Sequence, residues 1–493
     1  MFFLGYNDIH LLSILAFSPL LGLLFLVQTR EERNIQNCTL WVNVFTLLVA
    51  ALAMWSVDLP INGFDLIERA PWLSQGNVNY HLGVDNLSIV LVLLLTGIFP
   101  AIIIASFNQC RGGRRTRMML LLGLEGCLLL AICAIDIIVL FIAFTAGYLC
   151  FLALIKTSGH MLARTSLLQL AIGLTVLLIA LLKISDITGS FSFEIVRYEA
   201  TKASLGKYLN LMILLALFSV AYPLGYVKRT FDEKERDFSI IDFVSTTPML
   251  IGRIFLIYRL FSIVCCAECR YCLYASFFCL FFNLYKLKKL ATIKFNSVQV
   301  SFRQPAQDKL ASGYVRACAL CLERIIISFV LIDLLIEPTP KSVYLIANYT
   351  LALACVCTLP RCRVKPKFDT IALSGLMLFC TGFPCWSYVN TLQKIILQDN
   401  WLFGVAYIIG VFMFVGVIFS FVKNAENIKR QLCLSLESSR QDFRTYALST
   451  CSIAMVAGSL VTVNAYPYVL PAPICFSVDR ISINLLRNPR APT

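Results

Sequence analysis

Long apolar runs alternate with short polar segments along the whole chain of 493 residues. A helix that crosses a bilayer needs about 20 predominantly apolar residues, and the pattern predicts an all-α polytopic membrane protein with about 14 transmembrane helices. We expect a single transmembrane domain over residues 1–493. The expected spans are Ile9–Val27, Leu40–Trp55, Ile89–Phe107, Met118–Ala134, Ile135–Ile155, Thr165–Ile184, Leu209–Val227, Phe243–Val264, Cys272–Leu284, Tyr314–Ile336, Ser342–Leu359, Ile371–Val389, Leu402–Val422 and Thr445–Val463.

Polar segments and prolines interrupt this pattern. Residues 56–80 are expected to form a long extramembrane loop, and residues 423–444 form a polar, basic linker before the last helix. Pro223 and Pro248 fall inside expected spans, and a proline inside a helix removes a backbone donor. We therefore expect these two helices to be interrupted. Interrupted helices in the two halves of a chain would fit a transporter with inverted repeats.

Two connections are short. The expected spans on either side of Ala134–Asp136 are nearly continuous, so the turn between them must be tight. Asp136 is expected to cap the helix that begins at Ile137, because an Asp side chain accepts from the free N–H groups of a first helical turn. Thr188-Gly189-Ser190 is the turn signal after the sixth span.

Composition supports a membrane protein and excludes several other classes. Hydrophobic residues make up 59% of the chain and charged residues 14%, against about 25% charged in soluble domains. The net charge is 42 − 28 = +14, but the basic residues lie mainly between apolar runs. This placement indicates the bias of Lys and Arg toward the non-translocated face, with attraction to anionic lipid headgroups, and we expect no nucleic-acid partner.

The cysteines indicate no disulfide framework. Most of the 20 lie inside apolar runs, where thiols act as small hydrophobic groups. Cys265, Cys266, Cys269 and Cys272 have the spacing of ligands for zinc or an iron–sulfur cluster. However, no second cysteine group at a recognisable spacing completes such a site, so we expect no metal.

Ionisable groups inside spans are costly and are therefore functional candidates. Glu125 could relay protons or could be bonded to a neighbouring helix. Lys183 lies near a helix end, where it could join a path or extend toward the interface. Arg253 is always protonated and suits holding an anion or water more than relaying a proton. Lys289 could store a proton, although Lys286 and Lys288 beside it suggest a surface cluster.

Motifs of soluble enzymes are missing from the sequence in any credible context: there is no Walker motif, GxGxxG fingerprint, HExxH or GxSxG. We predict no catalytic residue and no cofactor-binding site in this chain. The residues themselves favour a multi-helix transporter or an energy-coupling subunit.

One segment carries a family resemblance. YHLGVDNLS (Tyr80–Ser88), which follows two spans and a Trp-containing loop, resembles subunit 4 of NADH:ubiquinone oxidoreductase, respiratory complex I. Four weaker similarities follow in the family's order. They are LEGCLLLAICAIDIIVLFIAF (Leu124–Phe144), Thr188-Gly189-Ser190, LKKL (Leu287–Leu290) and Gly382-Phe383-Pro384.

The resemblance implies an antiporter-like fold with interrupted helices and a proton path of buried carboxylates and lysines. This sequence departs from that path at several positions. The family's fifth-helix glutamate falls on Ala146 and the lysine of its VKxP motif on Ala221. The next lysine falls on Gly252 or Arg253, and the histidine of the AHG motif on Ser312. An alanine cannot titrate, so at least two relay positions are empty. The resemblance therefore implies a highly diverged subunit whose own proton path is degenerate.

The resemblance further implies a core membrane-arm subunit of mitochondrial complex I, with other membrane-arm subunits and membrane lipids as partners. NADH, FMN, iron–sulfur clusters and ubiquinone would bind elsewhere in the complex. The apolar N-terminus, without a presequence, suggests organelle encoding and residence in the mitochondrial inner membrane. Within this interpretation, protons cross through Glu125, Lys183, Arg253 and Lys289, or the subunit is a scaffold. The alternative is an independent cation/proton antiporter or other secondary transporter.

Overall fold

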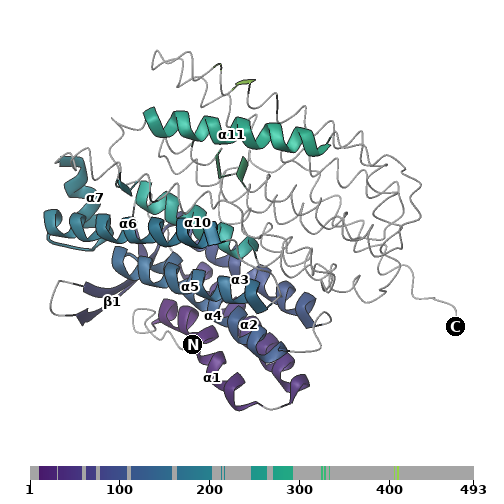
Figure 1. Ribbon diagram of the computed structural model, residues 1–493. Helices are drawn as coiled ribbons and strands as arrows, with labels where there is room; N and C mark the ends of the chain where they lie inside the picture. Colours follow the sequence, from purple (N-terminus) through teal and green to yellow (C-terminus); the bar gives the residue numbers. More distant parts are fainter. Residues whose placement is uncertain are drawn as a thin grey trace, which may run out of the picture.

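A computed structural model describes residues 10–29, 31–57, 63–73, 78–107, 113–157, 164–202, 246–261 and 270–291, with a few isolated positions beyond them. These residues form mainly long helices (Figure 1). The helices are α1 (Leu11–Gln28), α2 (Glu32–Ser56), α3 (Asn86–Phe107), α4 (Arg114–Cys133), α5 (Ile137–Thr157), α6 (Arg164–Thr188), α7 (Phe193–Lys202), α10 (Thr246–Phe261) and α11 (Arg270–Ala291).

Helix α4 is the centre of the described bundle, because it contacts α1, α2, α3, α5 and α10. Small residues allow these close approaches, as is usual where helices pack inside membranes. A Cβ atom added to Gly126 of α4 would lie 2.7 Å from Leu20 of α1, and one added to Gly22 would lie 2.8 Å from Val42 of α2. At these positions a side chain of one helix therefore fills the space over a glycine of the next.

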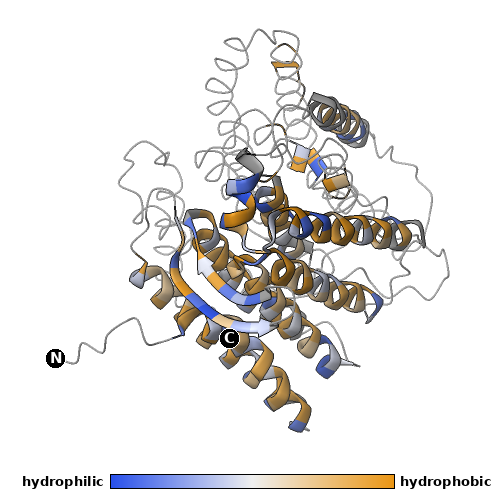
Figure 2. Ribbon diagram, turned by 90° about the vertical axis from the view of Figure 1, so that its left-hand side faces the viewer, coloured by the Kyte–Doolittle hydropathy of each residue, from blue (hydrophilic) through white to orange (hydrophobic). Residues whose placement is uncertain are grey.

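Five described helices or helix segments are long and apolar enough to cross a membrane: Leu11–Gln28, Asn34–Ser56, Arg114–Cys133, Ile137–Thr157 and Leu168–Thr188. In Figure 2 the ribbons of the described helices are coloured mainly as hydrophobic residues. The chain is thus a polytopic helical membrane protein. The expected count of about 14 spans is not reached within the described residues. The expected linker 423–444 and most expected spans after Ala291 lie outside those residues.

The prediction of a purely helical chain with a loop over 56–80 was wrong in one respect. Strands β1 (Asp65–Leu73) and β2 (Val78–Val84) form an antiparallel hairpin, with Arg69 opposite His81 and Ala70 opposite Tyr80. Polar and apolar residues mix along both strands (Figure 2). Proline and glycine suggested a loop, but main-chain pairing and packing against the helix ends make this segment a strand pair.

Pro248 lies in helix α10, whose described residues run from Thr246 to Phe261. Residues 243–245 lie outside the described residues, so the expected interruption at Pro248 stays a prediction. Pro223 lies outside the described residues. The tight turn around Ala134–Asp136 is confirmed, since α4 ends at Cys133 and α5 begins at Ile137.

Candidate functional site

The turn between α4 and α5 is held by two other segments. The Ile135 N–H donates to the His81 carbonyl oxygen of β2 at 2.9 Å, and the Ile135 carbonyl accepts from the Phe193 N–H at 3.1 Å. A Cβ on Gly83 of β2 would lie 2.5 Å from the Ile135 side chain. The hairpin, the start of α7 and the turn therefore form one connected layer at this end of the bundle.

Asp136 caps α5, as predicted. Its carboxylate accepts from the Ile138 N–H at 3.0 Å and from the Asn79 N–H at 3.3 Å. Burial raises the pKa of Asp136 above its ordinary value, although its backbone hydrogen bonds act in the opposite direction. The same side chain thus satisfies the start of α5 and ties it to β2.

A buried ion pair joins α10 to the start of α3. The Arg259 Nη1 donates to Asp85 Oδ2 at 2.8 Å, and the two side chains are 4% and 16% exposed. Asp85 Oδ1 also accepts from the backbone N–H and the hydroxyl of Ser88, both at 2.7 Å, which makes it the N-cap of α3. One carboxylate therefore caps a helix and neutralises a distant arginine.

Three phenyl rings enclose the Arg259 guanidinium. Its Cζ lies 4.6 Å from the ring centroid of Phe64, 4.9 Å from that of Phe193 and 5.1 Å from that of Phe255, within the range of cation–π attraction. Sequence reasoning missed this cluster. Asp85 lies inside the segment that carried the resemblance, but nothing local to it points to Arg259, 174 residues away.

Glu125 is fully buried in the middle of α4. Leu128, three residues later and so on the same side of the helix, would touch a Cβ on Gly252 of α10 at 2.7 Å. Among the described residues neither carboxyl oxygen has a hydrogen-bond partner. The alternative that Glu125 is simply bonded to a neighbouring helix therefore finds no support in this part of the chain.

Arg253 lies on α10 and is 1% exposed. Its Cζ lies 5.8 Å from the ring centroid of Tyr148 on α5. The neighbouring Gly252 has no room for a side chain, since an added Cβ would lie 2.7 Å from Leu128. Arg253 is thus the buried cation at this point of α10, and it bridges toward α5.

The two predicted lysines lie elsewhere. Lys183, near the end of α6, pairs with Asp186 at 3.1 Å, and both side chains are exposed, at 65% and 68%. The structure does not bring Lys183 into the buried interior with Glu125 and Arg253. Lys289 is in the last turn of α11. Ala146 is half-buried on α5, whereas Ala221, Ser312 and three of the four clustered cysteines, Cys265, Cys266 and Cys269, lie outside the described residues.

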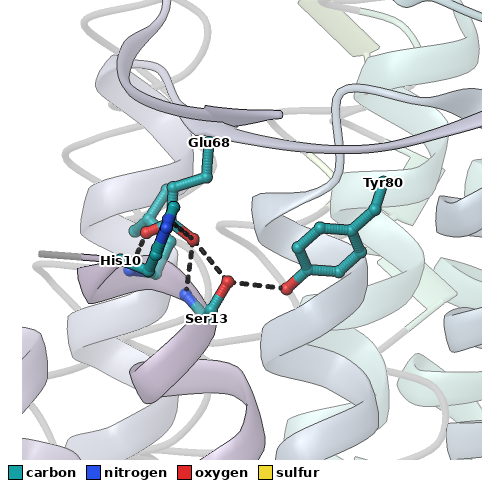
Figure 3. Close-up of polar contacts among 5 residues, drawn as sticks. His10, Ser13, Glu68 and Tyr80 are labelled. Atoms are coloured by element: carbon teal, nitrogen blue, oxygen red, sulfur yellow. Dashed lines mark hydrogen bonds and ion pairs between the residues drawn. The ribbon is translucent and has the colours of Figure 1, made fainter. Parts of the chain in front are cut away.

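A second polar cluster joins the hairpin to α1 (Figure 3). The Glu68 carboxylate accepts from the backbone N–H of Leu12 at 2.6 Å and of Ser13 at 3.0 Å, and from the Ser13 hydroxyl. The Tyr80 hydroxyl lies 2.9 Å from that of Ser13, and His10 Nδ1 lies 3.9 Å from Glu68. Burial raises the pKa of Tyr80. Glu68 therefore caps α1 from a strand 55 residues away.

These features define a class: a polytopic helical membrane protein with buried charged groups on packed helices. Comparison with known proteins narrows the class. The chain is 24% identical over 221 residues to NADH-ubiquinone oxidoreductase chain 4 of Marchantia polymorpha, covering 43% of this chain and 44% of the relative. It is 26% identical over 266 residues to NADH-quinone oxidoreductase subunit M of Mycobacterium tuberculosis, covering 44% and 48%. The resemblance to this subunit is thereby confirmed.

The matches span about half the length of these relatives, and no family model matches the chain. Similarity of fold extends further. Respiratory complex I from Thermus thermophilus with bound NADH contains a chain that superposes with a TM-score of 0.61 at 13% identity, over 92% of this chain and 99% of that one. A chain of the Mrp complex from Dietzia sp. superposes with a TM-score of 0.61 at 12% identity, over 92% of this chain and 96% of that one. These likenesses show the fold.

Proposed function

We propose that this chain is a membrane-arm subunit of an NADH:quinone oxidoreductase of the complex I type, in the position that chain 4 or subunit M holds. The observation that carries the proposal is the sequence similarity to that one subunit in plant and bacterial relatives. The chain would lie in the mitochondrial inner membrane, be encoded in the organelle and contact other membrane-arm subunits and lipids. NADH, FMN, iron–sulfur clusters and ubiquinone would bind elsewhere in the complex.

We further propose that its proton path is reduced and depends on Glu125. Ala146 stands where the resemblance expects a carboxyl, while Glu125, on the adjacent helix α4, is buried and has no hydrogen-bond partner among the described residues. An unbonded carboxylate is costly to keep ionised in an apolar interior. Glu125 is therefore suited to exchange a proton with transient water. Arg253 would supply a fixed positive charge rather than carry the proton.

Membership in the complex is tested by isolation. The tagged chain is purified from its native membrane in mild detergent and the product is separated by size. We expect it to migrate with a large assembly that oxidises NADH. Isolation of the chain alone, with cation-driven proton transport after reconstitution in vesicles, would contradict the proposal and favour the independent antiporter.

The role of Glu125 is tested in the assembled complex. Glu125→Gln keeps the size of the side chain but removes its ability to release a proton. We expect fewer protons translocated per NADH with the assembly intact. Asp186→Asn, on an exposed carboxylate, is the matched control and should leave the ratio unchanged. If Glu125→Gln also leaves it unchanged, the subunit is a scaffold.

A further inference from the structure

Basic residues gather at the end of the bundle that lies opposite the hairpin. The connection 108–117, between α3 and α4, carries four arginines, and the connection 156–164, between α5 and α6, carries one lysine and one arginine. Neither segment contains an acidic residue. The connection 29–33, between α1 and α2, carries two arginines and two glutamates. These segments together therefore have an excess of positive charge.

Arg115 joins the start of α4 to the end of α1. Its Nε donates to the Leu26 carbonyl oxygen, in the last turn of α1, at 3.0 Å. A guanidinium has five N–H donors, and this bond uses one of them. The group is therefore held at the ends of two candidate membrane spans and has further donors for an anion. Guanidinium groups match phosphate oxygens in a bidentate geometry.

The last turn of α5 lies beside the first turn of α4. A Cβ on Gly123 of α4 would lie 3.3 Å from the Cys150 Sγ of α5, and a Cβ on Gly147 of α5 would lie 3.4 Å from the Cys127 Cβ of α4. Positions rise along α4 as they fall along α5, so the two helices are antiparallel. The same register brings Lys156, an exposed residue in the last turn of α5, level with the first turn of α4.

The preferences of an isolated helix do not explain the arginines of α4. Arg114, Arg115 and Arg117 lie in its first turn, where no acidic residue accompanies them. A helix N-terminus carries partial positive charge, so cations in the first turn destabilise the helix. Arg117 is buried, whereas Arg114 and Arg115 are half-buried at the surface. The two surface arginines and Lys156 therefore present a cationic group of side chains that suits an anion.

An exposed apolar stripe on α1 leads away from Arg115. Its residues recur every three or four positions, on one face of the helix, and are 41–63% exposed: Ile14, Phe17, Leu21 and Leu24. The stripe is about 15 Å long, about half of a hydrocarbon core of about 30 Å. It therefore matches the depth of one leaflet, and it ends one turn or less from the Leu26 carbonyl that Arg115 binds.

We propose that this end of α1, α4 and α5 binds an anionic phospholipid. The phosphate contacts Arg114, Arg115 and Lys156, and one acyl chain lies along the stripe on α1. Charge complementarity selects this occupant, because basic groups at a membrane surface attract anionic headgroups, whereas a zwitterionic headgroup brings a cation of its own. A soluble phosphate would leave the apolar stripe uncovered.

The opposite end of the same helices does not suit such a lipid. The hairpin and the helix starts packed on it present the carboxylates of Glu68, Asp85 and Asp136. The proposed site therefore belongs to one leaflet only. It depends on the chain being a membrane protein and not on membership in an NADH-oxidising assembly.

The experiment uses the full chain in the assembly with which it is purified, placed in vesicles of phosphatidylcholine. The probe is a trace of phosphatidylglycerol with a diazirine on its acyl chain, and phosphatidylcholine with the same chain is the comparison. After irradiation, labelled peptides are identified by mass spectrometry. We expect phosphatidylglycerol to label the peptide that contains Leu24 several-fold more than phosphatidylcholine does, and the excess to fall as salt is raised.

Arg114→Gln combined with Lys156→Gln removes two charges and keeps the bond from Arg115 to Leu26. This variant should lower the labelling by phosphatidylglycerol to the level given by phosphatidylcholine. Lys156→Gln alone changes an exposed side chain and should give a partial loss, so the test does not depend on how the start of α4 tolerates substitution. Arg69→Gln, on an exposed arginine of the hairpin, is the matched control and should leave the labelling unchanged.

The proposal is overturned if the two lipids label α1 equally, or if both variants are labelled like the unaltered chain. Either result would mean that ordinary boundary lipid covers this surface. Neither readout involves NADH oxidation or proton transport, so failure here and failure of the proposed function are separate results.

Discussion

Asp85→Ala removes one partner of the buried ion pair with Arg259 and the N-cap of α3 together. Breaking a buried pair by removing one partner costs about 3–5 kcal/mol, because a buried charge loses its counter-charge. Loss of an N-cap adds about 1 kcal/mol. Arg259 keeps the Ser88 hydroxyl at 3.3 Å and the three phenyl rings. We therefore expect the lower end of the ion-pair range, about 3 kcal/mol, and with the lost cap a decrease of about 4 kcal/mol in the free energy of unfolding.

The matched control is an ion pair of similar length on the surface. Lys183 and Asp186 are 3.1 Å apart but 65% and 68% exposed, and such pairs contribute about 0–1 kcal/mol. Asp186→Ala should therefore have little effect. Both variants are measured in the detergent-solubilised protein by thermal and denaturant unfolding, with hydrogen exchange in the first turn of α3 as a local readout.

The reasoning is refuted if Asp85→Ala and Asp186→Ala destabilise the protein equally, since burial would then not decide the strength of the pair. A double variant separates the contribution of the ion pair from the contribution of the N-cap. Asp85→Ala with Arg259→Met removes both charges and should recover most of the ion-pair loss but not the cap. Hydrogen exchange at the start of α3 should stay fast in the double variant.

Three further predictions concern packing, capping and pH. Gly126→Ala should lower the free energy of unfolding by about 1–3 kcal/mol, because its Cβ would lie 2.7 Å from Leu20. In Gly123→Ala the nearest side-chain atom would lie 3.3 Å from the new Cβ, so this variant should be destabilised less, as measured by thermal unfolding. Glu68→Gln should weaken the start of α1 by about 1 kcal/mol, seen as faster amide exchange in its first turn; unchanged exchange there would contradict the capping role. Burial first, then nearby positive charge, lowers the pKa of His81 from 6.5. Stability should therefore be full above pH 6.5 and fall as the pH drops below it, and His81→Gln should flatten this loss in unfolding curves at several pH values.

The candidate site was only partly predictable. Glu125 and Arg253 could be found from the sequence, because a charge within an apolar run is visible without knowing its neighbours. The cap at Asp136 was also predictable from the sequence, because its side chain bonds to the helix that follows it directly in the chain. For Lys183, near a helix end, the sequence left open a place in the path or an extension toward the interface, and the side chain is exposed and paired with Asp186. Exposure depends on which face of α6 meets other helices, which no local pattern reveals.

The length and spacing of apolar runs by themselves determined the membrane class and the approximate positions of the helices, because a span forms its backbone hydrogen bonds within one segment. Only the tertiary structure decided what crosses between segments. The hairpin over 65–84, the pairing of Asp85 with Arg259 and the capping of α1 by Glu68 each depend on packing between elements. Contacts of this kind are set by helix rotation and register, which the hydrophobic pattern of a single strand or helix does not specify.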